Sequence, residues 1–315
     1  MIIKPVNINE LSKISDSVFL SEKWLAMYDG ALLPYGIFDK NDKITGGFIL
    51  YKEKRKMLSY FRNPPYMPHT GLFFENKASN KAKRYGTAKK YLKLVADFVN
   101  GLPYDVLTIA LPPEIIDTQP FFWQNFKVIP NYTYIIELEQ PEKDIISGFA
   151  SERRNDLKRA DKDNIITKHI SDMKIVKDLV SKTFDRKNKS LDDNMLDKIL
   201  FDFSSEENSF AFASFKNDKP IACAFCIYDN HKTYYLLGGY DSQNKHQGAG
   251  SKAIVESILF AKKKGIPLFD FEGSMLQEVE HYFRGFGGTL TPYYTLNKGK
   301  LFAELALKYS FRAQF

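Results

Sequence analysis

The stretch TYYLLGGYDSQNKHQGAGSKAIVESILFAKKKGIPLFDFEGSMLQEVEHYFRGFGGTLTPYYTL, residues 233–296, decides the fold. It opens with an aromatic and aliphatic run at 233–237, which predicts a strand that runs into Gly238-Gly239. A polar loop at 241–250 follows, and after it comes a helix with apolar side chains on one face. The turn between strand and helix therefore presents free backbone N–H groups at the positive end of a helix.

The end of this helix is also marked in the sequence. Lys262, Lys263 and Lys264 lie at its negative end, and Gly265 follows as a helix cap. Pro267 then opens a short buried strand, predicted at 268–271. Strand, glycine-rich turn, helix and strand form a βαβ unit. The unit predicts an α/β fold in which the sheet is mixed, as in α+β proteins.

Three motifs in this stretch resemble the second domain of the Fem family of non-ribosomal peptidyltransferases, within the GNAT superfamily of N-acyltransferases. They are Tyr235-Leu236-Leu237-Gly238-Gly239-Tyr240-Asp241, Phe269-Asp270-Phe271 and Tyr282-Phe283-Arg284-Gly285-Phe286-Gly287-Gly288. The family usually has Phe-Lys-x-x-Phe-Gly in the last motif, where this chain has Arg284. The resemblance implies two tandem GNAT-like domains and, as in Fem-type enzymes, an aminoacyl-tRNA donor.

An internal repeat agrees with two such domains. Gly101-Leu102-Pro103 and Gly265-Ile266-Pro267 each follow the long helix of one half of the chain. Two further pairs recur in the same order: Trp123-Gln124-Asn125-Phe126 with Phe283-Arg284-Gly285-Phe286, and Tyr132-Thr133-Tyr134 with Pro292-Tyr293-Tyr294. We predict an N-terminal GNAT-like domain at 1–140, a C-terminal one at 141–299, and a helix at 300–315.

Two helices outside the βαβ unit follow from local pattern alone. Residues 16–28 predict a helix with an apolar side, and the strongly charged residues 142–161 predict another. Residues 77–100 predict the long helix of the first half.

Composition indicates an ordinary globular protein with anionic partners. The chain has 315 residues, 44% of them hydrophobic, and a formal charge of +7. This charge favours tRNA, a nucleotide-linked substrate, CoA or a membrane face, although plain solubility explains it equally well. The N-terminus lacks the long apolar core of a signal peptide, and no apolar run predicts a membrane span.

Cys223 and Cys226 are the only cysteines, and they lie within one apolar run at 221–227. Residues three apart on a strand point to opposite faces, and the chain has no second pair of cysteines. We therefore predict two buried structural thiols and no metal site. Thiols without a disulfide framework suit a reducing cytoplasm, which is the predicted location.

The predicted chemistry begins at the strand before the glycine turn. In GNAT folds this strand splays from its neighbour and offers an unpaired N–H to the acyl carbonyl, and Gly238-Gly239 would permit the splay. The alternative is that the two glycines simply end the strand. The superfamily's acyl-CoA loop, Gln/Arg-x-x-Gly-x-Gly/Ala, resembles 245–250, so Lys245, Gln247, Gly248 and Gly250 are candidate cofactor contacts. A glycine-rich helix start without a ligand is the alternative.

Three residues are candidate catalytic groups. The resemblance places Arg284 in the channel between amine and acyl donor, where a guanidinium would act electrostatically; a surface pair with Glu280 is the alternative. Asp270 is a base or a buried cap, and Tyr240 ends the splayed strand.

Five residues are candidate substrate contacts. Arg186 ends Thr183-Phe184-Asp185-Arg186, which resembles the family's Thr-x-x-Arg at a substrate-facing helix end, and Tyr282 and Phe283 belong to the last Fem-like motif. Tyr66 and His69 lie in the irregular, proline-rich segment 62–71, where a rigid connector is the alternative.

We expect an N-acyltransferase of the Fem-like GNAT type. It would pass an aminoacyl or acyl group to an amine acceptor, and a peptidoglycan precursor is the acceptor that we consider. A second hypothesis is an acetyl-CoA-dependent N-acetyltransferase of a small molecule or protein. A third is a non-catalytic ligand-binding member of the fold. The donor substrate would be acyl-CoA or aminoacyl-tRNA, and no other cofactor is required.

Overall fold

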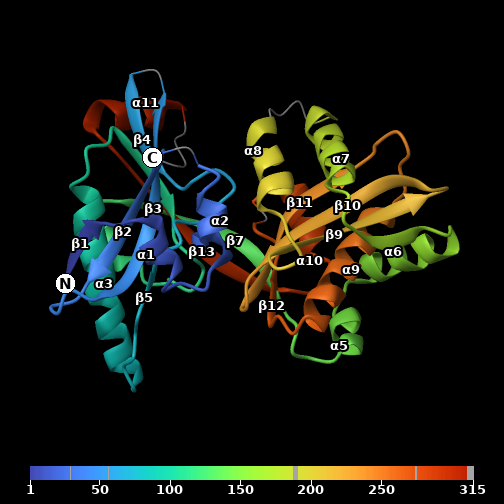
Figure 1. The fold of residues 1–315 in the computed structure, drawn as a ribbon, viewed down its shortest axis with the longest axis horizontal. Helices are drawn as coiled ribbons and strands as arrows, with labels where there is room; N and C mark the ends of the chain where they lie inside the picture. The colour runs from blue at the N-terminus through green and yellow to red at the C-terminus, as the bar shows by residue number, and fades with distance from the viewer. Residues whose placement is uncertain (29, 56, 187–190, 274, 311–315) are drawn as a thin grey trace. The chain divides into compact units, whose positions relative to one another are not determined.

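The computed structural model describes residues 1–28, 30–55, 57–186, 191–273 and 275–310. The chain divides into two compact units, which Figure 1 shows as a ribbon. Unit 1 comprises Met1–Asn131 and Pro292–Phe315, and unit 2 comprises Tyr132–Thr291. Each unit combines helices with a mixed sheet, so the predicted fold class is confirmed.

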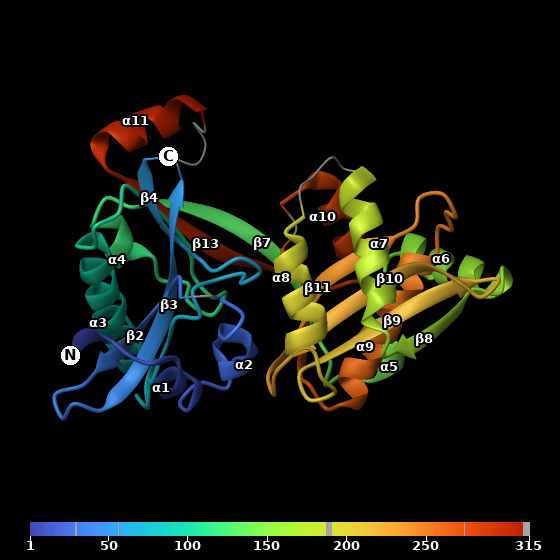
Figure 2. The same ribbon diagram turned by 45° about the horizontal axis from the view of Figure 1, so that its top comes forward.

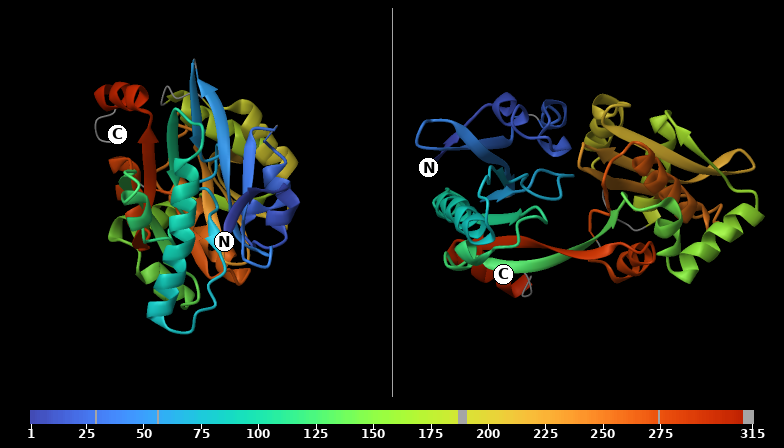
Figure 3. Two further views of the ribbon diagram at one scale, coloured as in Figure 1. Left: turned by 90° about the vertical axis from the view of Figure 1, so that its left-hand side faces the viewer. Right: turned by 90° about the horizontal axis from the view of Figure 1, so that it is seen from below.

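The sheet of unit 1 is built from neighbouring antiparallel strands and one parallel pair. Its strands follow the order β1 (Ile2–Pro5), β2 (Leu32–Phe38), β3 (Ile44–Arg55), β4 (Leu58–Arg62), β6 (Val106–Ala110) and the second half of β13 (Thr289–Gly299); β5 (Phe73–Phe74) pairs with β3. β4 and β6 are parallel, as expected for strands joined through the helix α3 (Lys81–Asn100). α3 lies against the sheet (Figure 3), and its buried residues Leu92, Val95 and Val99 share one hydrophobic core with residues of the strands.

Unit 2 has the same arrangement. Its strands follow the order β7 (Lys127–Glu137, second half), β12 (Leu268–Asp270), β11 (Lys232–Tyr240), β10 (Lys219–Tyr228), β9 (Ser209–Lys216) and β8 (Ile166–Ile170). β11 and β12 are parallel and are joined through α9 (Ala249–Lys263). The helices α7 (Met173–Arg186) and α8 (Asp193–Asp197) lie on one face of this sheet and α9 lies on the other (Figure 2).

The predicted internal repeat is visible in the order of elements. Trp123 follows the short helix α4 (Gln119–Phe122), and Phe283 lies near the end of α10 (Gln277–Arg284), at the same place in each half. The final strands are exchanged: β13 pairs with β6 in unit 1, and β7 pairs with β12 in unit 2. Both strands pass from one unit to the other at repeat-related residues, Tyr132 and Pro292. The compact units therefore have other bounds than the predicted domains at 1–140 and 141–299. Those two ranges describe the sequence repeats, and they stay a prediction.

The prediction of one continuous helix at 142–161 is wrong. The chain forms α5 (Glu142–Ser147) and α6 (Ser151–Lys162), with Phe149 between them. The Phe149 ring is buried against Phe286, with ring centroids 5.7 Å apart, and the Ala150 N–H donates to the Gly285 carbonyl at 2.8 Å. These tertiary contacts outweigh the local helical pattern.

The helix predicted at 16–28 is also broken. The chain forms the 3₁₀ helix η1 (Val18–Leu20) and the short helix α2 (Glu22–Leu25), because Ser21 has extended backbone angles and caps α2. The long helix predicted at 77–100 begins at Lys81, where Asn80 accepts a hydrogen bond from the Lys83 N–H. The C-terminal helix, α11 (Leu301–Ser310), is present, and 311–315 lie outside the described residues.

Both cysteines are buried and free on β10, as predicted. Burial raises the pKa of the Cys223 thiol to about 12 and that of Cys226 further. Neither thiol is therefore a reactive thiolate at neutral pH.

A substitution at Gly239 tests how closely α7 packs on β11. A Cβ at Gly239 would lie 2.6 Å from the Leu179 carbonyl carbon and 2.7 Å from the Val180 nitrogen, both backbone atoms of α7. We expect Gly239→Ala to lower the free energy of unfolding by about 1–3 kcal/mol, measured by urea denaturation. Gly86→Ala is the matched control, since Gly86 lies in α3 with open space around it, and it should be neutral or stabilising by up to about 1 kcal/mol. Equal effects of the two changes would contradict this account of Gly239.

Candidate functional site

The strands β11 and β12 part in the middle of unit 2. Their parallel pairing ends at Tyr234 and Asp270, whereas β11 continues to Tyr240 with β10 as its partner on the other side. A bulge at Leu236 interrupts the β10–β11 register: Phe225 pairs with Leu237 and Cys226 with Tyr235. The part of β11 at 235–239 thus has an edge that no described strand pairs, which leaves backbone N–H and C=O groups available.

Both glycines of this strand are required by close packing. They stay within β11, paired with Ala224 and Cys223, so they do not end the strand. A Cβ at Gly238 would lie 2.0 Å from the Tyr235 hydroxyl oxygen, and Gly239 contacts α7. The splay predicted from the GNAT resemblance is present; Gly238 leaves room there for the Tyr235 side chain of the same strand, and Gly239 lets α7 approach β11.

A buried ionic cluster lies where the strands part. The Asp270 side chain, at the end of β12, accepts a hydrogen bond from the Thr133 hydroxyl at 2.7 Å and another from the Glu272 N–H at 2.9 Å. Its second oxygen lies 3.5 Å from the Lys232 ammonium, and Lys232 is itself only 4% exposed. The Thr133 hydroxyl in turn accepts the Gly273 N–H at 3.1 Å. Asp270 therefore caps the turn after β12, which is the alternative that the sequence left open.

Glu272 is the unusual member of this cluster. Its φ is 64°, in the left-handed region that a side chain such as glutamate rarely adopts. Burial and the neighbouring Asp270 carboxylate raise the pKa of Glu272 well above its ordinary value, and the Lys232 ammonium opposes this shift. Strained backbone and a perturbed carboxyl group beside an open strand edge are features of catalytic sites.

The far end of β11 gathers other predicted residues. The Tyr240 N–H donates to the Thr183 hydroxyl at 2.8 Å, and the Arg186 guanidinium lies 5.9 Å from the centre of the Tyr240 ring. Arg186 is exposed at the end of α7. The structure thus brings Tyr240 and Arg186 together at the end of β11, whereas Lys232 of the Asp270 cluster lies at the start of that strand, about 26 Å away.

The glycine-rich loop before α9 is covered by α6. A Cβ at Gly248 would lie 2.1 Å from the Asp156 carbonyl oxygen, so α6 leaves no space beside this residue. The Asp156 carboxylate is buried, accepts the Ser251 hydroxyl at 3.0 Å, and pairs with Arg153 at 3.1 Å. A carboxylate of the chain itself therefore lies at the positive end of α9.

The remaining loop residues lie around this contact. Lys245 and Gln247 are exposed, and the Gln247 side chain accepts a hydrogen bond from Arg159 of α6. Gly250 is close to the Tyr282 hydroxyl, which would lie 3.3 Å from an added Cβ.

The last Fem-like motif combines core and surface residues. Phe283 is 8% exposed and stacks on Phe271 with ring centroids 4.7 Å apart, so its side chain is part of the core. The Tyr282 hydroxyl lies 3.1 Å from the Ser251 hydroxyl, and the Arg153 guanidinium lies over the Tyr282 ring, 4.5 Å from its centre. Arg284 is exposed and its Nε lies 3.0 Å from Glu280, which is the surface pair that the sequence allowed.

Tyr66 and His69 lie in unit 1. Tyr66 has a φ of 60°, another left-handed non-glycine residue. His69 is buried, and its Nδ1 accepts the Gly71 N–H at 3.0 Å, so the ring holds the irregular segment in place.

Sequence reasoning missed Glu272, Lys232 and Thr133. The available signal was Asp-x-Glu directly after a predicted buried strand, 270–272, in which only Asp270 was selected. Lys232 and Thr133 are far from Asp270 in sequence, and only the pairing of β12 with β11 and β7 brings them to it.

Comparison with known proteins agrees with this fold. Residues 182–284 match the model of the acetyltransferase (GNAT) domain family. FemX is similar over 93% of this chain and 97% of its own, with a TM-score of 0.64 and 11% identity. The fold is that of tandem GNAT domains.

Two further solved structures share this fold. One is the C-terminal domain (DUF2156) of a putative lysylphosphatidylglycerol synthetase from Agrobacterium fabrum, with a TM-score of 0.58, 11% identity, and coverage of 95% of this chain and 94% of that one. The other is a tandem GNAT protein from the clavulanic acid biosynthesis pathway, with a TM-score of 0.50, 6% identity, and coverage of 94% and 97%. The resemblance to a Fem-like GNAT acyltransferase is thus confirmed for the fold.

A search for relatives among curated proteins found no match. In the described parts of the chain, no helix combines the length and apolar character needed to cross a bilayer.

The perturbed carboxyl group makes stability depend on pH in a defined direction. Because the folded-state pKa of Glu272 lies above its ordinary value of 4.5, the folded protein loses stability as pH rises from about 4.5 through the raised value. Glu272→Gln removes this loss. We expect the variant's Tm to exceed that of the unmutated protein at about pH 8 and the difference to vanish near pH 4.5. Glu207→Gln, an exposed surface change, is the control; a Glu272→Gln Tm difference independent of pH would contradict the raised pKa.

Proposed function

We propose that this protein is an N-acyltransferase that passes an aminoacyl group to an amine acceptor at the open edge of β11 in unit 2. The observation that carries the proposal is the separation of β11 from β12 beside a buried carboxylate cluster. N-acyl transfer needs donors for the developing oxyanion and an acceptor for the amine proton, and this edge offers both. The GNAT domain match supports a transferase of this kind.

In the proposed reaction the acyl carbonyl accepts a hydrogen bond from a backbone N–H of β11 at 235–239. Glu272 takes the proton from the attacking amine, since its raised pKa brings it closer to the working pH than that of an ordinary glutamate. Asp270 holds the turn that carries Glu272, and Lys232 balances the Asp270 charge. Asp270 is therefore a positioning residue in this scheme.

The geometry at α9 favours a donor other than acyl-CoA. A pyrophosphate on the glycine loop would need the backbone N–H groups at the start of α9, where the backbone of α6 leaves no space beside Gly248 and the Arg153-paired carboxylate of Asp156 already accepts from Ser251. We infer an aminoacyl-tRNA donor, with Arg186 as an anion contact at the end of β11 and a nucleotide-linked peptidoglycan precursor as acceptor. The buried reduced thiols suit action in the cytoplasm.

The test compares donors with the same acceptors. The purified protein is incubated with a UDP-linked muropeptide and either aminoacyl-tRNA, charged with a radiolabelled amino acid, or radiolabelled acetyl-CoA. We expect transfer from aminoacyl-tRNA and no calorimetric binding of CoA. Transfer from acetyl-CoA would overturn the donor assignment and favour an N-acetyltransferase, whereas no transfer from either donor would favour the non-catalytic alternative.

Glu272→Gln is expected to lower the transfer rate about 10²–10⁴-fold at unchanged donor affinity, because the proton acceptor is lost. Glu256→Gln is the matched control, since Glu256 is another partly buried glutamate of unit 2 whose pKa is raised by burial. It should leave the rate unchanged. An active Glu272→Gln with an unaltered pH–rate profile would reject Glu272 as the base.

Arg284 remains a proposed electrostatic contact for the donor or acceptor. Its pair with Glu280 is exposed, so Arg284→Ala should change stability by less than about 1 kcal/mol. We expect the same change to lower the rate about 10²–10³-fold and Arg284→Lys to retain most activity, because the charge survives. A fall in Tm with unchanged turnover per folded molecule would show a purely structural pair.

A further inference from the structure

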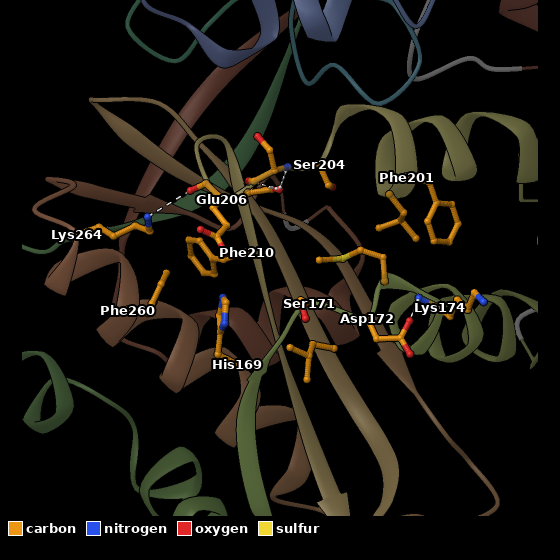
Figure 4. A pocket seen from close by; sticks show the side chains of 15 residues that line it. His169, Ser171, Asp172, Lys174, Phe201, Ser204, Glu206, Phe210, Phe260 and Lys264 are labelled. Carbon is orange, nitrogen blue, oxygen red and sulfur yellow. Dashed lines mark hydrogen bonds between the residues drawn. The ribbon is translucent and has the colours of Figure 1, made fainter.

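We propose that unit 2 carries a second binding site, separate from the acyl-transfer edge, for a planar aromatic ring that bears an anionic group. The site is a cavity of about 650 Å³ at the end of β8, shown in Figure 4. It is lined by β8, the start of α7, the π-helix η2 (Lys198–Phe203) with its following loop, the start of β9 and the end of α9. A volume of this size holds a nucleotide-sized molecule.

One wall of the cavity is aromatic. His169 stacks on Phe260 with ring centroids 5.1 Å apart and planes 23° apart, and the Phe210 ring meets Phe260 at 4.8 Å. His169 is exposed on β8, so a face of this stack is accessible from the cavity side. Such a platform accepts a further planar ring by stacking.

The opposite wall contains a π-helix and an exposed aromatic ring. In η2 the Ser204 N–H donates to the Ile199 carbonyl, five residues back, at 3.2 Å. π-Helical turns of this kind are rare and frequently lie at functional sites. Phe201 of this helix is 46% exposed at the cavity, where a ligand ring would cover it.

Two lysines at the rim supply cationic groups for an anion. The Lys264 ammonium contacts neutral oxygens, the Tyr228 hydroxyl at 3.0 Å and the Glu206 carbonyl at 3.5 Å, and lies 5.4 Å from the centre of the Phe260 ring. Lys174 is exposed at the start of α7. Neither lysine forms an ion pair with a described residue. Asp172 caps the Lys174 N–H at the positive end of α7, which offsets its charge, and Glu206 is the other carboxylate of the rim.

The cavity does not belong to the acyl-transfer edge. In the sheet order of unit 2, β10 and β9 lie between β11 and β8, and none of the residues of the Asp270 cluster lines the cavity. Occupancy of this site can therefore be measured without acyl transfer.

The experiment uses calorimetry on the full chain with four probes: adenosine 5′-monophosphate, indole-3-acetate, adenosine and inorganic phosphate. We expect the two aromatic anions to bind and adenosine or phosphate alone to bind about tenfold more weakly, since each keeps only one of the two contacts. The tighter of the two aromatic anions identifies the preferred combination of ring and anionic group. Absence of binding by both, or equal binding of adenosine, would overturn the proposal.

Variants place the binding in the cavity. His169→Ala and Phe201→Ala change exposed side chains, and each should weaken the aromatic anions about tenfold. Lys264→Gln should weaken adenosine 5′-monophosphate but not adenosine. Ile166→Ala on β8 and Lys263→Gln on α9 are matched controls outside this cavity and should leave affinity unchanged. Binding that is insensitive to all three cavity variants would reject this location.

Discussion

The buried carboxylate of Asp270 is the interaction on which the arrangement at the centre of unit 2 depends. A carboxylate that is 3% exposed would be costly without partners, and here Thr133, the Glu272 N–H and Lys232 supply them from three strands or their ends. These contacts fix the turn after β12 at the point where β11 departs. The open edge, the strained Glu272 and the buried lysine are therefore parts of one arrangement, and removing Asp270 would take away a carboxylate that offsets the buried charge of Lys232.

Close backbone packing shapes the rest of the site. Gly239 lets α7 approach β11, so Thr183 can hold the Tyr240 backbone and Arg186 can reach its ring. Gly248 lets α6 approach α9, so Asp156 reaches the helix start, where the Ser251 hydroxyl donates to its carboxylate. Glycine thus allows close packing in both places: at Gly239 it lets α7 approach β11, and at Gly248 it lets α6 cover the start of α9. The open edge of β11 and the covered start of α9 are the physical reasons to place the reaction at the strand edge and to look for a donor other than CoA.

The sequence predicted the elements whose pattern is strong and local. Apolar periodicity and the Gly265 cap predicted α9, and Pro267 followed by a short apolar run predicted β12. The helix at 142–161 was wrong because the Phe149–Phe286 contact, invisible in local pattern, breaks it. Motifs made Arg186 and Tyr240 candidates, and both stay predictions; no motif pointed to Glu272, since its raised pKa arises from burial beside Asp270 and Lys232. Burial of one charged group by partners distant in sequence is a property of the fold and leaves little trace in composition.

The repeat also explains why the chemistry is assigned to one unit. Aligning Gly101-Leu102-Pro103 with Gly265-Ile266-Pro267 sets Val106 opposite Asp270 and Thr108 opposite Glu272. In unit 1 the strands do not part at this point: β4 stays paired with β6 through Arg62 and Thr108. Without the carboxylates and without the open edge, this part of unit 1 has neither the proton acceptor nor the free backbone donors that acyl transfer requires. The two halves therefore share a fold but only the second has the local departures from it that a reaction needs.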